Sequence, residues 1–262
     1  MMIAVDTNVE KFDLAQWLDG AVFLDFDGTL VDLAETPDTV VVAPGLVQVL
    51  ASLGERLQGR LAIVSGRPIA QIDAMLAPLK LPVAGVHGAE RRDYTGQLHI
   101  ATAPSLDAAQ LILRALVLAH DGLLLEEKRG ALALHYRLAP GLRVQCEQAM
   151  AAALAAAPGT VLLHGKMVLE LKPAATNKGS AVAEFLQEEP FKGRKPVFVG
   201  DDTTDEAGIA YAQELGGIGV KVGAGPSAAR CRLDSPQALH AQLAHAAQTA
   251  LSTSSISPGD TP

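Results

Sequence analysis

The spacing of apolar and polar positions divides the chain into three stretches. In the first, up to about residue 99, short apolar runs alternate with segments whose apolar residues recur at helical spacing. The runs Ala21–Leu24, Leu61–Val64 and Val83–Val86 predict strands, and the segments 44–57 and 69–76 predict helices. This alternation predicts a parallel sheet with helices on both faces.

The second stretch, from about residue 100 to 172, has a different pattern. A helix followed by a hairpin is predicted twice. The first helix is Ser105–His120, and its hairpin strands are Leu123–Glu127 and Ala131–Arg137. The second helix covers 141–157, and its hairpin strands are Thr160–His164 and Met167–Lys172. Because hairpin strands run in opposite directions, this order predicts a small α/β module with a mostly antiparallel sheet.

After Pro173 the first pattern returns. Helices are predicted over Asn177–Glu188, over 204–214 and from Ser235, and strands over Pro196–Val199 and Ile218–Val222. We therefore predict a doubly wound α/β core formed by residues 1–99 and 173–262. An α/β cap domain, residues 100–172, is inserted into this core. The final segment, STSSISPGDTP, has few apolar residues and is expected to be disordered.

Composition and charge exclude several classes of protein. The 262 residues carry 21 basic and 29 acidic side chains, a formal net charge of −8, so nucleic acids and anionic membranes are not expected partners. The two cysteines, Cys146 and Cys231, are isolated, which is typical of a reducing, cytoplasmic setting. The first twenty residues lack a signal-peptide pattern, and the apolar window Ala149–Leu163 is too short to span a membrane. For the oligomeric state, we expect a monomer.

Polar residues stand directly after the apolar strands of the predicted core. They are Asp25, Asp27, Ser65, Arg67, Asp201, Asp202 and Asp205, joined by Lys178 at the start of a predicted helix. In an open parallel sheet, ligands bind at the carboxyl ends of the strands. Carboxylates gathered there suit Mg²⁺, while a hydroxyl and a lysine suit a phosphate group. The sequence therefore indicates a magnesium-assisted phosphoryl transfer.

These residues resemble the motifs of the haloacid dehalogenase superfamily of phosphatases. DFDGTL (Asp25–Leu30) and GDDTTDE (Gly200–Glu206) match its first and last motifs in the correct order. The resemblance implies that Asp25 is the nucleophile that forms an aspartyl-phosphate, and that Asp27 is the general acid and base. It also implies that Ser65 and Lys178 hold the transferring phosphoryl group. The Mg²⁺ ligands would be Asp25, the backbone carbonyl of Asp27, and Asp201, with Asp205 and Asp202 supporting the site.

A narrower resemblance is to the trehalose-6-phosphate phosphatase family. The segments that carry it are SGRP (Ser65–Pro68), GVHGAE (Gly85–Glu90), EEKRGALALHYR (Glu126–Arg137), GKMVLELKP (Gly165–Pro173) and NKG (Asn177–Gly179). The resemblance implies an α/β cap inserted after the third strand, Mg²⁺ as cofactor, a sugar-phosphate substrate and a role in trehalose biosynthesis.

Three charged residues of the second stretch are candidates for sugar recognition. Glu126 and Lys128 lie two positions apart on a predicted strand, so they share a face, and Glu170 shares a face with Val168 and Lys172 on another predicted strand. Two carboxylates and an ammonium suit a neutral ligand rich in hydroxyl groups. Arg67 is also assigned to substrate binding, with a structural ion pair as an equal alternative.

Structural roles remain open for several of these residues. Glu126, Lys128 and Glu170 could form a cross-strand charge network, and His87 could be a satisfied core histidine. Lys166 and Lys172 compete with Lys178 as the phosphate-binding lysine. The leading function is hydrolysis of trehalose 6-phosphate. The alternatives are another sugar phosphatase with the same cap type, a signalling receiver domain, and a catalytically idle sugar-phosphate binder.

Overall fold

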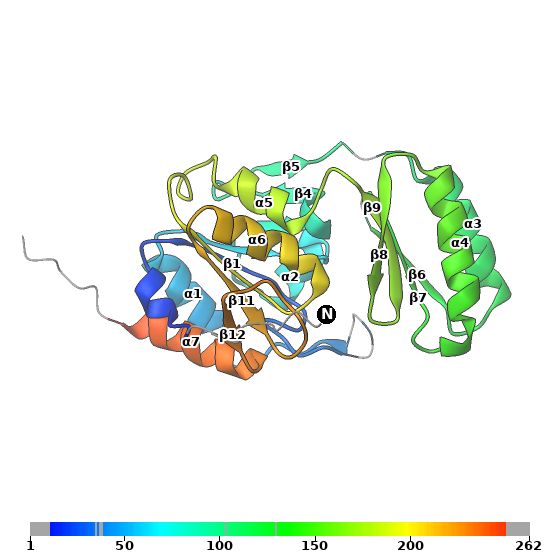
Figure 1. Ribbon diagram of the computed structural model, residues 1–262. Coiled ribbons are helices and arrows are strands. Elements are labelled where there is room, and N and C mark those ends of the chain that lie inside the picture. Colours follow the sequence, from blue (N-terminus) through cyan, green and yellow to red (C-terminus); the bar gives the residue numbers. More distant parts are fainter. Residues whose placement is uncertain (1–10, 35, 37–38, 103, 129, 250–262) are drawn as a thin grey trace, which may run out of the picture.

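The computed structural model describes residues 11–34, 36, 39–102, 104–128 and 130–249, and it contains two sheets (Figure 1). The predicted disorder of the last eleven residues lies outside this part of the chain. The larger sheet has the order β12-β11-β10-β1-β2-β3-β4-β5, and the smaller has the order β6-β7-β9-β8. The chain leaves the larger sheet after β5, builds the smaller one, and returns to the larger sheet at β10.

The core consists of the larger sheet and five α-helices. Its strands are β1 (Ala21–Leu24), β2 (Leu61–Val64), β3 (Val83–Gly85), β4 (Glu90–Arg92), β5 (Leu98–Ile100), β10 (Pro196–Gly200), β11 (Ile218–Val222) and β12 (Cys231–Leu233). Its helices are α1 (Leu46–Arg56), α2 (Ile69–Met75), α5 (Lys178–Phe185), α6 (Glu206–Glu214) and α7 (Pro236–Gln248). The predicted elements from Ala21–Leu24 to the last helix are thus confirmed, with shifts of a few residues at their ends.

The strand β1 lies in the middle of the parallel part of the sheet, between β10 and β2. Its four residues are fully buried because side chains point alternately to two hydrophobic layers. Val22 and Leu24 pack in the layer that contains residues of α1 and α7. Phe23 packs in the opposite layer and stacks on Phe191 with ring centroids 5.6 Å apart.

The sheet is longer than the sequence predicts. Strands β4 and β5 extend it as an antiparallel hairpin, and β12 adds a parallel strand at the other edge. The apolar signal is missing at β4 because its residues are Glu90, Arg91 and Arg92, which are held by ion pairs and hydrogen bonds. The predicted strand Val83–Val86 is also one residue too long, since β3 ends at Gly85 and Val86–Gly88 forms a 3₁₀ turn.

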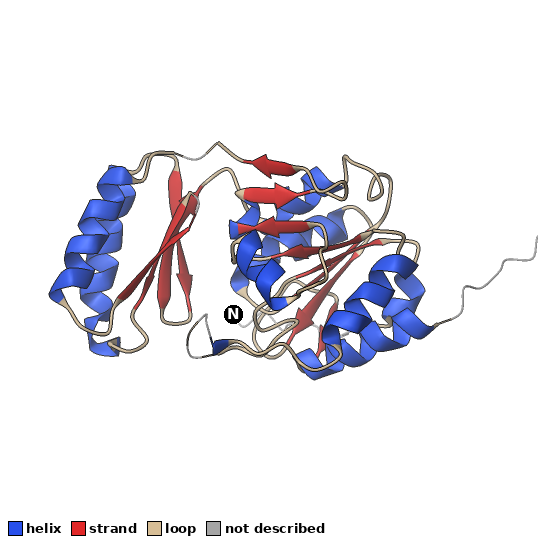
Figure 2. Cartoon of the chain, turned by 180° about the vertical axis from the view of Figure 1, so that it is seen from behind, coloured by secondary structure: helices blue, strands red, loops and turns tan. Residues whose placement is uncertain are grey.

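The smaller sheet is fully antiparallel, as predicted, and two helices cover one of its faces. The elements are α3 (Asp107–Ala119), β6 (Leu124–Lys128), β7 (Ala131–His135), α4 (Arg143–Ala156), β8 (Thr160–Gly165) and β9 (Val168–Pro173). We call this unit the small module. Figures 1 and 2 show its sheet between its helices and the core, so the uncovered face of the sheet is turned toward the core.

Candidate active site

A cavity of about 630 Å³ lies between the carboxyl ends of the core strands and the uncovered face of the small module. Asp25 follows β1 and Asp201 follows β10, and both side chains line the cavity. Glu126, Lys128 and Glu170 line it from the small module. The edge at which ligands are expected for this fold therefore borders a cavity that two separate parts of the chain line.

Lys178 binds two of the aspartates at the base of this cavity. Its Nζ donates to Asp25 Oδ1 and to Asp205 Oδ1, in both cases over 2.6 Å. Lys178 opens α5, where Asn177 caps the helix by accepting a hydrogen bond from the backbone N–H of Ser180. Burial alone would lower the pKa of the Lys178 ammonium, but the two carboxylates raise it, so the lysine is a fixed positive charge.

Three carboxylates converge around this lysine and carry more negative charge than it can balance. Oxygen atoms of Asp25, Asp201 and Asp205 all lie within 4.8 Å of one another. Burial, together with the charge of Asp205, raises the pKa of Asp25 well above its usual value and that of Asp201 to about 6. A further cation at this position would stabilise the ionised carboxylates.

The details of the cluster fit a divalent cation with oxygen ligands. Asp201 Oδ1 is buried without a hydrogen-bond partner in the described part of the chain. A Cβ atom on Gly28 would lie 2.2 Å from Asp201 Oδ2, so only glycine leaves room for this carboxylate. Asp205 differs, because its Oδ1 accepts from Lys178 and its Oδ2 accepts from the backbone N–H groups of Asp201 and Asp202.

Asp27 and Arg67 form a bidentate ion pair in the cavity. Arg67 Nε donates to Asp27 Oδ2 over 2.7 Å, and Nη2 donates to Oδ1 over 2.8 Å. Ser65 is buried beside them, and its Oγ accepts from the backbone N–H of Arg67 over 3.1 Å. The structural ion pair considered as an alternative for Arg67 is thus present, and the contact of Arg67 with substrate stays a prediction.

The three candidate sugar-binding residues lie together, as their positions on the strands predicted. Lys128 Nζ is 3.1 Å from Glu170 Oε1 and 3.8 Å from Glu126 Oε2. His87 Nε2 is 3.1 Å from Glu170 Oε2, and His135 Nε2 is 3.1 Å from Glu126 Oε2. Burial would raise the pKa of Glu170, but His87 and Lys128 lower it to about 2, so this carboxylate is ionised near neutral pH.

Lys221 is a buried cavity-lining residue that the sequence analysis missed. Its Nζ donates to the backbone carbonyls of Asp201 and Val222 and so fixes the segment that carries Asp201. The available signal was a lysine inside the apolar run of β11, near the carboxyl end of a buried strand. Lys172, which competed with Lys178 in the sequence, instead donates to the backbone carbonyls of Pro173 and Thr176.

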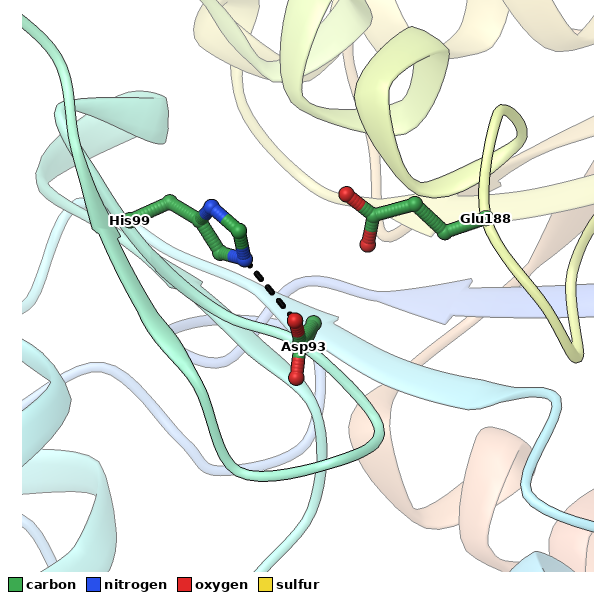
Figure 3. A group of neighbouring side chains, drawn as sticks. All are labelled: Asp93, His99 and Glu188. Carbon is green, nitrogen blue, oxygen red and sulfur yellow. Dashed lines mark hydrogen bonds and ion pairs between the residues drawn. The ribbon is translucent and has the colours of Figure 1, made fainter.

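Figure 3 shows a second acidic group, formed by Asp93, His99 and Glu188. None of the three lines the cavity. The oxygens of this group are already occupied by protein donors. Asp93 Oδ2 lies 2.8 Å from His99 Nε2, and its Oδ1 accepts from the backbone of Thr95 and Gln97. Both oxygens of Glu188 accept from Arg91. This cluster is therefore explained by its ion pairs without a metal.

The comparisons with known proteins agree with this geometry. The trehalose-phosphatase family model matches residues 23–237. The chain belongs to the trehalose-phosphatase family. This membership confirms the family resemblance drawn from the sequence motifs, and it identifies the protein as a phosphatase.

Two relatives are similar to this trehalose-phosphatase family member over most of their length. A probable trehalose-phosphate phosphatase of Sinorhizobium fredii is 46% identical, over 80% of this chain and 79% of the relative. The trehalose-6-phosphate phosphatase of Escherichia coli is 44% identical, over 81% of each chain.

Solved structures confirm the predicted fold class. A trehalose-6-phosphate phosphatase related protein is 28% identical with a TM-score of 0.66, covering 85% of this chain and 94% of that one. A haloacid dehalogenase-like hydrolase from Bacteroides thetaiotaomicron, 15% identical with a TM-score of 0.59 over 85% and 97% of the chains, shares the fold. Among the described residues, every helix is too short or too polar to cross a membrane.

Proposed function

We propose that the protein is a Mg²⁺-dependent phosphatase that hydrolyses trehalose 6-phosphate to trehalose and phosphate in trehalose biosynthesis. The observation that carries the proposal is the single cavity that joins the aspartates of the core to Glu126, Lys128 and Glu170 of the small module. A phosphoester needs the first group of residues, and a hydroxyl-rich sugar suits the second. The substrates named for the two bacterial relatives support this assignment.

The proposed reaction has two steps. A carboxylate oxygen of Asp25 attacks phosphorus, the bond from phosphorus to the sugar oxygen breaks, and Asp27 gives that oxygen a proton. Asp27 then takes a proton from a water molecule that attacks phosphorus, which releases phosphate and restores Asp25. Lys178 and Ser65 would hold the phosphoryl group during both steps. Arg67 orients the Asp27 carboxylate in the state described here.

Asp25, Asp201 and the backbone carbonyl of Asp27 would hold Mg²⁺, with Asp205 supporting them. The unpartnered Asp201 Oδ1 supports a direct role for Asp201, and the occupied oxygens of Asp205 support an indirect one. When bound, Mg²⁺ would neutralise charge on the phosphoryl oxygens.

The small module, residues 100–172 in our assignment, would act as a cap. Its charged residues would accept hydrogen bonds from the glucose hydroxyls and donate to them, and its sheet would shield the aspartyl-phosphate from stray water. A cytoplasmic location and a monomeric state are part of the proposal. The isolated spacing of the two cysteines in the sequence supports a reducing compartment.

The substrate is tested by measuring phosphate release from a panel of sugar phosphates. Trehalose 6-phosphate should give the highest kcat/KM, and an equal or better value for glucose 6-phosphate or a sucrose phosphate would reject the assignment. Removing Mg²⁺ with a chelator should abolish turnover, and Asp25→Asn should abolish it while the protein stays folded. Activity close to wild type in Asp25→Asn would reject the nucleophile.

Lys128→Ala separates sugar recognition from chemistry. Its kcat/KM for trehalose 6-phosphate should fall about 30-fold or more, since the largely buried charge partner of Glu170 is removed, with a much smaller fall for a small aryl phosphate. Glu127→Ala is the matched control, because Glu127 precedes Lys128 in β6 and pairs with Arg114 of α3 on the opposite face. Equal losses on both substrates in Lys128→Ala would remove this residue from the recognition site.

A further inference from the structure

His87 connects the two sides of the cavity. It belongs to the 3₁₀ turn that follows β3 in the core, and its Nε2 lies 3.1 Å from Glu170 Oε2 on β9 of the small module. Lys128 makes a second connection by donating to the backbone carbonyl of Gly66 over 3.2 Å. Two residues assigned to sugar recognition thus contact the core through His87 and through the loop that carries Ser65 and Arg67.

The backbone at His87 is held in an unfavourable conformation. His87 has φ 54° and ψ 32°, and Val86 before it has φ 48°, so both lie in the left-handed region. This region is uncommon for histidine and rarer still for a β-branched residue, and such conformations persist where the surroundings fix them. Here the N–H groups of Val86 and His87 donate to the carbonyls of Arg67 and Ser65.

The same loop makes room for the imidazole ring. A Cβ atom on Gly66 would lie 2.8 Å from His87 Nε2, so the ring lies directly against this glycine. His87 is 6% exposed, and its ring nitrogen is directed at one oxygen of the Glu170 carboxylate, whose side chain is 12% exposed. Both the backbone and the ring of His87 are therefore fixed by the loop from Ser65 to Arg67.

We propose that His87 is a positioning residue that fixes Glu170 for recognition of the sugar, and that it does so from the core. The proposal rests on the proposed function, which supplies a sugar phosphate as ligand. Lys128 holds one oxygen of Glu170 and His87 holds the other, so the orientation of the carboxylate depends on both. The set of sugar-binding residues is then complete only when the small module lies against the loop that carries Ser65. In this way the sugar contact is coupled to the position of the phosphate-binding residues.

The test is a double-mutant cycle between His87→Asn and Glu170→Gln. Asparagine tolerates left-handed backbone, so His87→Asn keeps the turn, but its side chain is too short to reach Glu170. We expect KM for trehalose 6-phosphate to rise about 10-fold or more in His87→Asn, with kcat lowered less than about 3-fold. The double mutant should lose no more than about 3-fold beyond Glu170→Gln alone, since both changes remove one interaction.

Two further variants separate positioning from a purely structural role. His87→Gln places an amide N–H near the position of Nε2 and should restore most of the affinity lost in His87→Asn. His99→Asn is the matched control, because His99 also pairs with a carboxylate, Asp93, but away from the cavity. It should leave KM and kcat within about 2-fold of wild type.

Additive losses in the cycle, or equal losses on trehalose 6-phosphate and an aryl phosphate in His87→Asn, would overturn the proposal. Failure of the proposed function is recognised separately in the wild-type protein. If the wild-type protein prefers another sugar phosphate, the proposed substrate is rejected, and the same cycle measured with that preferred compound decides on His87.

Discussion

At the scale of single residues, the site is governed by an excess of negative charge in a buried space. Lys178 is bonded to two carboxylates, while Asp201 Oδ1 lacks a partner among the described residues. Two glycines make this crowding possible. A Cβ atom on Gly28 would overlap Asp201, and one on Gly200 would lie 2.2 Å from Asp205 Cγ. The glycines of the DFDGT and GDD motifs are therefore part of the acidic site.

Gly28→Ala tests this packing directly. The added methyl group must displace the Asp201 carboxylate, so we expect Mg²⁺ affinity to fall about 10-fold or more and turnover to fall further. Isothermal titration calorimetry with Mg²⁺ and a phosphate-release assay measure the two effects. Gly96→Ala is the control, because Gly96 has φ 90° against 79° for Gly28 but open space around its Cβ position. Equal effects of the two substitutions would show that backbone strain, and not the contact with Asp201, is responsible.

Residue identities predicted which side chains gather at the sheet edge, but not how they pair. Strand ends predicted that Asp25 and Asp201 lie together, because parallel strands end at one edge, and their oxygen atoms do lie within 4.8 Å of each other. The pairing of Arg67 with Asp27 depends on side-chain geometry across two loops, which spacing does not encode. The choice of Lys178 over Lys172 likewise depends on which ammonium reaches the carboxylates and which reaches the backbone carbonyls.

At the scale of elements, helix α5 positions the lysine of the site. Lys178 is its first residue, and a capping box between Asn177 and Ser180 fixes the start of the helix. The NKG motif therefore predicts a helix start at Asn177, and the structure confirms this prediction within one residue. The sequence does not predict the hairpin of β4 and β5, because its charged residues mask the alternation of apolar and polar positions that is typical of a strand.

Asn177→Ala should reduce both stability and activity. Loss of a helix cap costs about 1 kcal/mol, and fraying of the first turn moves Lys178 away from Asp25. Ser235→Ala is the control, because Ser235 caps α7 in the same way but lies far along the chain from the catalytic motifs. Urea unfolding should show similar losses of stability in the two variants, while kcat falls only in Asn177→Ala. A parallel loss of kcat in Ser235→Ala would contradict this account of the cap.

The turn of the β4–β5 hairpin should make stability depend on acid pH. Asp93 is partly desolvated, which would raise its pKa, but hydrogen bonds from His99 and Thr95 lower it from 3.8 to about 2. Because the folded-state pKa is depressed, this stabilisation is present above pH 4 and is lost as the pH falls toward 2. Asp93→Asn should therefore be less stable than wild type by about 1 kcal/mol at pH 6, with a smaller difference at pH 3. Urea unfolding at the two pH values measures this, and an unchanged difference would contradict the assigned pKa.

At the scale of the whole molecule, the apolar contacts of the core are separate from those of the small module. One pair of clusters surrounds the larger sheet, and a separate cluster lies between the smaller sheet and helices α3 and α4. A small cluster of Val86, Ala89 and Ala131 joins core and small module, along with the polar contacts of His87 and Lys128. Burial of apolar area dominates stability. Because there is little apolar contact between the core and the small module, each should unfold as its own cooperative unit.

Leu134→Ala should therefore destabilise the small module much more than the core. Leu134 is fully buried on β7, and its truncation costs about 2 to 5 kcal/mol. Native-state hydrogen exchange should speed up in β7 and β9 but change little in β1. Fluorescence of Trp17, the single tryptophan, should report nearly the same urea midpoint for the core as in wild type. Leu50→Ala, an equally buried change in α1, should reverse the pattern. If Leu134→Ala accelerated exchange in β1 as strongly as in β7, the core and the small module would unfold as one unit, and their separate cooperativity would be rejected.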